Sequence, residues 1–296
     1  MNDISYKLQK ASDFELDGKY LHAIQIYKSI LFSHPEDEDS LIGYSLLLEK
    51  MGHPKALLNL CVAYGSYSDA KPLVLNAFAS VLVKNNFYNE ALELLDNPNL
   101  VEDAQSKFIK CYSLFNLEHF DDCLVILSGF CKDYPSSQLL PHAEILLAKI
   151  YIEKEDYQRA LEAANRSEML FTQNSEVHLV KAIIYNHKKM FLHAFECIKK
   201  SLKLNSREII AVEWAAKISF RMQDYQSSEN YLNKCISMGC TDSEIFSMFG
   251  VIKLFNENKI GAEKYFKKAL ELDPQNYMAV TGIKELNSFY IIHGVN

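Results

Sequence analysis

Hydrophobic positions along the chain recur with the spacing of amphipathic helices, and the whole arrangement repeats at intervals of 34 residues. Counting by this interval places units at residues 4, 38, 72, 104, 141, 175, 209 and 243. Two irregularities interrupt the count: the unit at 72 is two residues short, and residues 138–140 are an insertion. A unit of this length fits two antiparallel helices joined by a tight turn, so the pattern predicts eight helix–turn–helix repeats.

Small residues occupy two fixed positions of the unit. Position 8 is small in all eight units: Ala11, Ser45, Ala79, Cys111, Ala148, Ala182, Ala216 and Gly250. Position 20 is small in all but the second: Ala23, Leu57, Ala91, Cys123, Ala160, Ala194, Ser228 and Ala262. Position 17 is aromatic in six: Tyr20, Tyr88, Phe120, Tyr157, Phe191 and Tyr225. We expect the first helix of each unit to pack closely on the second at position 8, where a large side chain would not fit.

The unit at Ser243 carries the most complete pattern. Its positions 4, 7, 8, 20, 24 and 32 are Phe246, Phe249, Gly250, Ala262, Phe266 and Pro274. This pattern resembles the tetratricopeptide repeat (TPR), W-x2-L-G-x2-Y…A-x3-F…P, although Lys253 stands at position 11 in place of the usual Tyr. The resemblance extends over all eight units. It implies an all-α fold, a right-handed TPR α-solenoid of eight helix–turn–helix repeats.

The segment after Pro274 is amphipathic from Tyr277 to about Tyr290 and has no second helix to pair with. We expect it to be a C-terminal capping helix that covers the apolar face of the last repeat. The sequence has only 10 Gly and 7 Pro, with no run of them that would mark a linker. Residues 1–296 are therefore predicted to form a single TPR superhelical domain.

Composition narrows the kind of partner. The net charge of −7 argues against a nucleic-acid binder, which usually carries a basic face. No stretch approaches the roughly 18 apolar residues needed to span a bilayer, and the N-terminus shows no signal segment. Seven Cys occur without a CxxC motif, and Cys61, Cys111, Cys123 and Cys235 fall at core positions. We expect free, buried thiols in a protein of the cytoplasm, with no membrane insertion.

Catalytic motifs are missing from the sequence. It contains no GxSxG, P-loop or HExxH motif, and no nucleophile, base and orienting group fall together. His187 and His193 are six residues apart across a predicted turn, which leaves a metal pair open as a minor alternative. We expect no enzyme activity, no cofactor and no bound metal.

Recognition of a protein is the remaining function. In the TPR family, positions 2, 5, 9, 12 and 13 of the first helices face a concave groove. Carried onto repeats four to seven, these positions predict a largely apolar groove with a charged edge. Its expected binding residues are Phe108, Tyr112, Phe115, Ile145, Lys149, Ile152, Leu179, Ile183, Lys217, Phe220 and Arg221. An apolar groove of this kind suits a helix or an extended segment of a partner, while the same side chains could instead pack within the solenoid.

Two groove chemistries of the family are missing. The carboxylate clamp needs Lys, Asn and Arg at set positions, where the first three units have Leu8, Ser12, Gly43, Leu73 and Ala77. The ladder of Asn at position 6 is also missing, since this position is Trp214 in the seventh unit and apolar in most others. Neither a cochaperone role nor an Asn-ladder reader of peptides is supported.

Two functions of different classes remain open. The first is a protein–protein interaction scaffold or adaptor within a larger assembly, the common role of eight-repeat arrays. The second is a dedicated chaperone that holds a client protein, as in bacterial secretion systems, although such chaperones usually have about three repeats. The sequence leaves open self-association, and whether the concave or the convex face carries the main interface.

Overall fold

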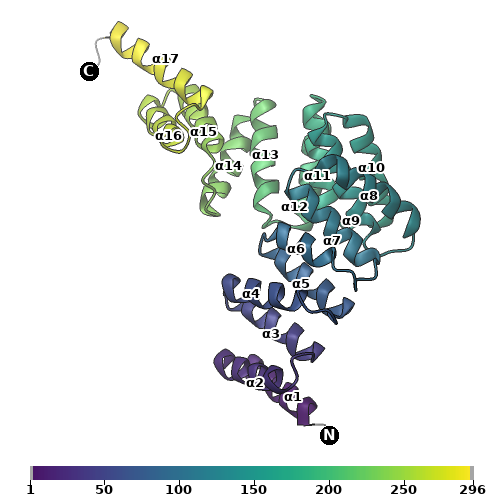
Figure 1. The fold of residues 1–296 in the computed structure, drawn as a ribbon. Helices are drawn as coiled ribbons and strands as arrows, with labels where there is room; N and C mark the ends of the chain where they lie inside the picture. The colour runs from purple at the N-terminus through teal and green to yellow at the C-terminus, as the bar shows by residue number, and fades with distance from the viewer. Residues whose placement is uncertain (1–2, 294–296) are drawn as a thin grey trace. The chain divides into compact units, whose positions relative to one another are not determined.

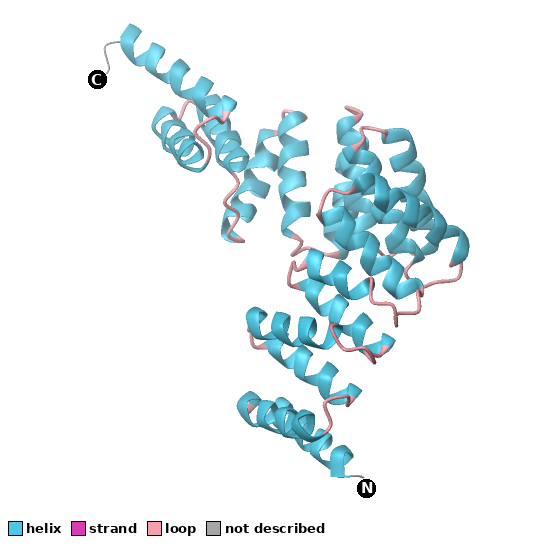
Figure 2. Cartoon of the chain, viewed as in Figure 1, coloured by secondary structure: helices cyan, strands magenta, loops and turns pink. Residues whose placement is uncertain are grey.

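The computed structural model describes the backbone of residues 3–293 and the side chains of residues 3–288. This range contains 17 α-helices and no strand (Figures 1 and 2). The helices are α1 (Asp3–Leu16), α2 (Tyr20–Ser33), α3 (Glu38–Lys50), α4 (Pro54–Gly65), α5 (Pro72–Lys84), α6 (Tyr88–Leu95), α7 (Ala104–Asn116), α8 (Phe120–Asp133), α9 (Leu140–Glu153), α10 (Tyr157–Leu170), α11 (Ser175–His187), α12 (Phe191–Leu204), α13 (Ile209–Arg221), α14 (Tyr225–Ser237), α15 (Ser243–Phe255), α16 (Lys259–Leu272) and α17 (Tyr277–His293).

The helices form eight consecutive pairs followed by α17, which confirms the predicted all-α fold. The first helix of each pair begins within one residue of a unit start counted from the sequence. Even the short second helix of the third repeat, α6, is present and has only eight residues. The chain divides into two compact units, Met1–Ile150 and Tyr151–Asn296, which are described separately below.

The turn inside every pair has the same backbone geometry. Position 15 has a positive φ in all eight repeats: Gly18, Gly52, Asn86, Glu118, Glu155, Lys189, Gln223 and Glu257. In each turn the N–H of position 16 donates to the carbonyl of position 11, as Met190 does to Tyr185 at 2.8 Å. The N–H of position 15 donates to position 12, as Lys189 does to Asn186 at 2.9 Å. This pair of hydrogen bonds is the Schellman motif, which ends a helix with a left-handed residue. The same motif therefore closes all eight first helices, although only two of the eight residues are glycine.

Close packing within the pairs explains the small residues at position 8. Every position-8 residue is buried. At Gly250 on α15, an added Cβ would lie 2.4 Å from the ring of Phe266 on α16, far inside van der Waals contact. The helices of this pair approach each other closely only because position 8 has no side chain there.

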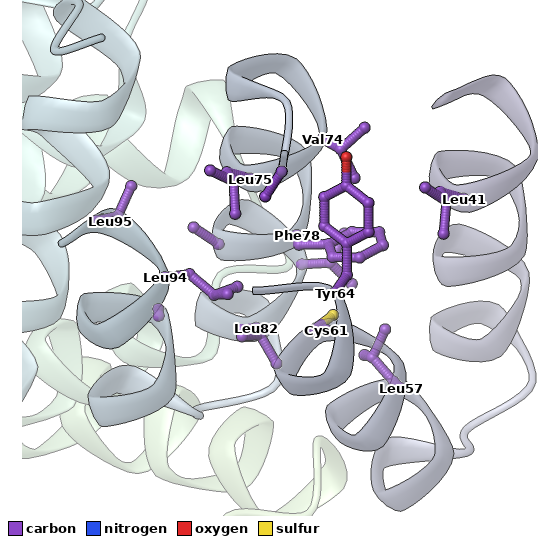
Figure 3. Packing of buried hydrophobic residues seen from close by; sticks show 14 of the residues in the cluster. Leu41, Leu57, Cys61, Tyr64, Val74, Leu75, Phe78, Leu82, Leu94 and Leu95 are labelled. Atoms are coloured by element: carbon purple, nitrogen blue, oxygen red, sulfur yellow. The ribbon is translucent and has the colours of Figure 1, made fainter. Parts of the chain in front are cut away.

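One hydrophobic core cluster of the first unit joins the second and third repeats. Figure 3 shows Tyr64 of α4 beside Phe78 of α5, with Leu57 and Cys61 on the same helix as Tyr64. The two rings meet edge to face with centroids 5.5 Å apart, and Phe78 is fully buried. The Tyr64 hydroxyl accepts a hydrogen bond from the backbone N–H of Lys71 at 3.0 Å, which satisfies its polar end. This cluster anchors the second repeat, the most irregular one, to the third.

The second unit ends in the predicted capping helix. Helix α17 packs on both α15 and α16, and its Ala279 and Leu286 are buried in one cluster with Phe246 and Phe266. The ring of Phe266 also lies against Gly282, where an added Cβ would be 2.3 Å away. The helix continues to His293, beyond the expected end near Tyr290. It covers the apolar face of the eighth repeat, as expected.

Candidate functional site

The predicted groove residues belong to both units, so each unit is considered by itself. In the first unit, Phe108 and Tyr112 lie one turn apart on α7, with ring centroids separated by 6.5 Å. Phe108 is half-buried against Phe130 and His142, each at 6.4 Å. Tyr112 keeps 38% of its surface exposed. Phe108 therefore packs against the protein through Phe130, while Tyr112 beside it stays accessible to solvent. An aromatic surface of this kind suits contact with an apolar side chain.

Two further residues predicted for this surface are engaged within the protein. Phe115 is half-buried beside Phe120, with ring centroids 5.7 Å apart, at the turn between α7 and α8. Ile145 on α9 is only 2% exposed, which corrects the expectation that it faces solvent. Lys149 is half-buried. An apolar residue of a first helix therefore cannot be assigned to the groove from its position alone.

In the second unit, Leu179 also differs from the expectation. It is 8% exposed and belongs to a cluster formed by α11, α12 and α13, with Ala211, Ala215 and Ile218 on the last of these. Ile183 is half-buried against the same cluster. The physical reason is that the next repeat covers this side of α11, so the two residues stabilise the stack.

Three other predicted residues of the second unit retain exposed surface. Ile152 is half-buried and Arg221 is exposed. Phe220 is half-buried, with its ring 5.6 Å from that of Tyr225, which in turn lies 4.7 Å from Phe255. Phe255 is 67% exposed, so the row of three rings emerges at the surface.

Lys217 forms ion pairs within the protein, where a groove residue was expected to meet a partner. Its ammonium lies 2.6 Å from Glu244 and 3.4 Å from Asp242, and its side chain is only 16% exposed. Burial lowers the pKa of Lys217, but the hydrogen bond to Glu244 and the two carboxylate charges outweigh it and raise the pKa overall. Lys217 therefore connects α13 to the start of α15.

Three aromatic rings on the second unit lie close together, and only one of them, His187, stands at a position that was expected to face the groove. The ring of His187 on α11 stacks on Tyr157 of α10 at 5.2 Å and lies 6.3 Å from Trp214 on α13. The ammonium of Lys217 lies 5.8 Å from the Trp214 ring. Tyr157 and Trp214 are half-buried and His187 is exposed. We name Tyr157, His187 and Trp214 the aromatic row.

The two histidines considered from the sequence contact different tyrosines. His187 stacks on Tyr157, whereas the ring of His193 lies 5.5 Å from Tyr185. Among the described residues, no group of three or more His, Cys, Asp or Glu side chains is placed to hold a metal ion. None of the seven cysteines, all of which lie in the described range, forms a disulfide, and Cys61, Cys111, Cys123, Cys235 and Cys240 are buried.

A partly buried polar cluster joins α10 and α11. The Nζ atom of Lys181 lies 2.6 Å from the Glu168 carboxylate and forms an ion pair with it. The Nδ1 atom of His178 lies 3.6 Å from the same carboxylate. Burial lowers the pKa of His178, whose residue surface is 6% exposed. Burial opposes ionisation of Glu168, yet Lys181 and His178 hold its pKa below the usual value. The cluster is a structural contact between helices.

Comparison with known proteins identifies the repeat. The tetratricopeptide repeat family model matches residues 243–276, the segment formed by α15 and α16. Residues 243–276 are therefore a tetratricopeptide repeat. No curated protein matches the sequence.

Solved structures support the TPR fold over nearly the whole chain. The Cut9–Hcn1 hetero-tetramer of the APC/C aligns with 97% of the chain at 14% identity and a TM-score of 0.68. Yeast Tom70 aligns with 100% at 14% identity and a TM-score of 0.58. A tetratricopeptide repeat protein from Parabacteroides merdae aligns with 97% at 14% identity and a TM-score of 0.52. The chain spans 57% of the Cut9–Hcn1 chain, 66% of Tom70 and 99% of the P. merdae protein. At these identities the likeness concerns the fold.

The TPR register places His187, but not Trp214, at a position that was expected to face the groove. Trp214 stands at position 6 of the seventh repeat and His187 at position 13 of the sixth, and both positions belong to first helices. The only Trp of the chain was a usable signal, since Trp is enriched at binding surfaces. None of the described helices has the length and apolar character needed to cross a bilayer.

Proposed function

We propose that this TPR protein is a non-catalytic scaffold or adaptor that binds a helix or extended segment of another protein. The observation that carries the proposal is the partly exposed aromatic surface on the first helices, represented by Tyr112 beside Phe108. Large aromatic side chains that are supported by a core but still accessible are typical anchors of protein interfaces.

The second unit offers a comparable surface. Trp214 and His187 of the aromatic row lie on first helices, and Phe220 begins a row of rings that ends at the exposed Phe255. The ion pairs of Lys217 connect α13 to the start of α15. They therefore help to fix the positions of the two helices that carry Trp214, Phe220 and Phe255. We propose that Arg221, which is exposed, contributes to partner orientation by charge.

The proposal includes a setting. We propose that the eight repeats act as one domain in the cytoplasm and take a protein partner in place of a nucleic acid, which the net charge of −7 supports. Binding to a second copy of the chain remains compatible with the same surfaces.

Affinity capture from the native cell tests this function. The immobilised wild-type chain should retain several stable partners, whereas a client-holding chaperone would retain one unstable client. Tyr112→Ala and Trp214→Ala should each weaken capture of these partners by about 5- to 150-fold, or about 1–3 kcal/mol, because each removes an anchor. Tyr6→Ala is the matched control, since Tyr6 is 60% exposed on α1. Folded variants that capture the partners as well as wild type would place the interface elsewhere.

A further inference from the structure

Exposed apolar side chains gather at the end of α10, in the second unit. Met169 is 84% exposed, Leu170 51% and Phe171 47%. The residues that α10 buries are all Ala or Ser, so these three large side chains are not part of its buried face. A side chain that is 84% exposed stands clear of its neighbours and therefore does not line a groove. Large exposed apolar side chains grouped in this way mark a surface that binds something.

The equivalent end of the next second helix, α12, adds exposed positive charge. Met169 and Leu170 stand at positions 29 and 30 of the fifth repeat, and Lys203 and Leu204 stand at the same positions of the sixth. Lys203 is exposed, and Leu204 is 39% exposed. Equivalent positions of consecutive repeats are neighbours in a stacked array, so the two helix ends contribute to one surface.

Most of the positive charge on α12 is not balanced by carboxylates. The segment from Cys197 to Arg207 contains four basic residues and no acidic one. One of the four is paired within α12. Lys200, Lys203 and Arg207 are exposed, and among the described residues none of them lies within ion-pair distance of a carboxylate. These three cations are therefore available to an anion outside the chain.

Contacts between the helices bring the basic and the apolar groups together. Burial opposes the ionisation of Glu168, the residue before Met169, but the charge of Lys181 and then that of Lys200 act to hold its pKa below the usual value. Lys200 therefore lies close to the end of α10. The Glu168 carboxylate is itself paired with Lys181 at 2.6 Å, so its negative charge is balanced there.

Helix α14 adds a further positive charge on the other side of α12. The Nζ atom of Lys234 donates to the backbone carbonyl of Ser206 at 2.8 Å, next to Arg207 in the chain. The carboxylate that follows in this loop, Glu208, accepts a hydrogen bond from the side chain of Asn205 at 3.2 Å. The surface is therefore locally positive, although the whole chain carries a net charge of −7.

The combination of groups selects the ligand. Side chains that stand clear of the surface can enter the boundary between the headgroups and the acyl chains of a bilayer, and Lys and Arg are attracted to anionic headgroups. An acidic protein segment would meet the same charges, but it would find no walls around Met169. The apolar and the basic residues act together only on a lipid surface.

We propose that the surface formed by the ends of α10 and α12 binds bilayers that contain anionic phospholipid. The binding is to the surface of the bilayer and involves no helix that crosses it. It does not rest on the proposed protein partner. The residues that meet the lipid are Met169, Leu170, Phe171, Lys200, Lys203 and Arg207.

Co-sedimentation of the full chain with lipid vesicles tests the proposal. One set of vesicles contains phosphatidylcholine with about 30% phosphatidylserine, and the other contains phosphatidylcholine alone. We expect binding to the anionic vesicles to be about 10-fold tighter or more, and to weaken as salt is added, because several cations contribute. Absence of binding to the anionic vesicles, or equal binding to both sets, would overturn the proposal.

Substitution of the apolar residues separates this site from simple attraction of charge. Met169→Ser combined with Phe171→Ser should weaken vesicle binding about 5-fold or more, because the two side chains no longer enter the bilayer. Phe32→Ser is the matched control: Phe32 stands at position 29 of the first repeat and is 93% exposed, but four acidic residues follow at 36–39. This control should change binding less than about 2-fold.

Substitution of the basic residues tests the other half of the site. Lys203→Gln combined with Arg207→Gln should weaken binding about 10-fold or more, since each basic residue near the surface contributes about 5-fold. Lys28→Gln combined with Lys55→Gln, at exposed lysines of the first unit, changes the net charge equally and should have less than about 3-fold effect.

Thermal midpoints establish that the variants are folded. Folded variants at Met169 and Phe171 that bind vesicles like wild type would contradict the proposed site, as would equal effects of the two pairs of basic substitutions. A labelled oligoglutamate peptide is the comparison ligand. Binding of this peptide without binding of vesicles would overturn the proposal in favour of an acidic protein partner.

Discussion

The Phe266 ring lies so close to Gly250 that a Cβ at the glycine would fall 2.4 Å from a ring carbon. Glycine inside a helix usually costs roughly 0.5–1 kcal/mol relative to alanine, so Gly→Ala in a helix is normally stabilising. Here the contact reverses the sign. We expect Gly250→Ala to lower the free energy of unfolding by about 1–3 kcal/mol, because the ring cannot move without disturbing α17 on its other side.

The matched control for this prediction is Gly129, which lies inside α8. A Cβ at Gly129 would meet only a carboxylate oxygen of Asp133, at 3.9 Å. Gly129→Ala should therefore raise the free energy of unfolding by up to about 1 kcal/mol. Urea unfolding of both variants measures the difference, and the same sign for both would show that the close approach at Gly250 is not limiting.

The left-handed turn residues predict an opposite pair of effects. Lys189 has a φ of 58°, a conformation that costs a non-glycine residue roughly 1–2 kcal/mol. Lys189→Gly should stabilise the protein by about 0.5–1 kcal/mol after the extra unfolded-state entropy of glycine is subtracted. Its neighbour Lys188 has a φ of −73°, so Lys188→Gly should destabilise the protein instead.

The reverse change, from glycine to alanine, tests the equivalent turn of the second repeat, where an added side chain meets no neighbour. Gly52 has a φ of 69°, and an added Cβ there would meet no atom within 4 Å. Gly52→Ala should nevertheless destabilise by about 1 kcal/mol from the backbone conformation alone. Calorimetric midpoints that rise for Gly52→Ala, or that fall for Lys189→Gly, would refute the assignment of these turns.

Lys217 should contribute to stability more than a surface lysine does. Lys217→Met leaves Asp242 and Glu244 next to each other without their shared cation, so we expect a loss of about 1–3 kcal/mol. Lys199→Met is the control, because Lys199 is 51% exposed and pairs only with Glu196 on its own helix. That change should cost less than about 0.5 kcal/mol. Equal losses in chemical denaturation would mean that the Lys217 pairs contribute no more than a surface pair.

His178 should make stability depend on pH on the acidic side of neutrality. Its pKa in the folded protein is lowered by burial, below the value near 6.5 of an unfolded chain. As the pH falls, the unfolded state therefore binds a proton at a higher pH than the folded state does. The free energy of unfolding keeps its full value above about pH 6.5 and decreases as the pH falls below it. Measurements between pH 7.5 and 5.5 stay above the range in which Glu168, whose pKa is also lowered, would take up a proton.

Substitution isolates this dependence. His178→Gln should flatten the slope of unfolding free energy against pH in that window, whereas His193→Gln, at an exposed residue, should leave the slope as in wild type. A wild-type slope that survives in His178→Gln would assign the dependence to another group.

The seven thiols should differ in reactivity by burial. Burial raises the pKa of Cys61 and of Cys235 to about 12, and that of Cys240 to about 11. At pH 8 these thiols are almost entirely protonated and therefore unreactive. We expect the half-buried Cys131 and Cys197 to be alkylated first in the native protein, and seven thiols to be counted after denaturation without reductant. Mass spectrometry that finds Cys61 labelled as fast as Cys197, or fewer than seven thiols, would contradict this.

The repeat frame could be predicted from sequence because it depends on packing that only small residues permit. Position 8 is buried in every repeat, and Gly250 shows why. The left-handed position 15 escaped prediction because its residues share no chemistry: two are Gly, and the others are Asn, Gln, Lys and three Glu. There the fold imposes the backbone conformation on whichever residue is present.

The binding surface was harder to predict than the fold, because position in a repeat does not determine exposure. Leu179 is covered by α13, and Lys217 finds its carboxylates 25 and 27 residues further along the chain, at the start of the next repeat. Asn76 could not be singled out for the same reason, since only the fold shows that its buried amide oxygen has no hydrogen-bond partner among the described residues.

The pairing of helices by short Schellman turns also bears on how the protein is made. Within each unit, the described contacts join consecutive helices, such as α11 and α12, or helices separated by one other helix, such as α11 and α13. Such local contacts need little loop closure and favour fast folding. Helix pairs can therefore dock one after another as the chain leaves the ribosome, each new pair burying its apolar face on the one before it. The last apolar face is covered only when α17 emerges, so a ribosome stalled before residue 277 would hold a chain with an uncovered eighth repeat.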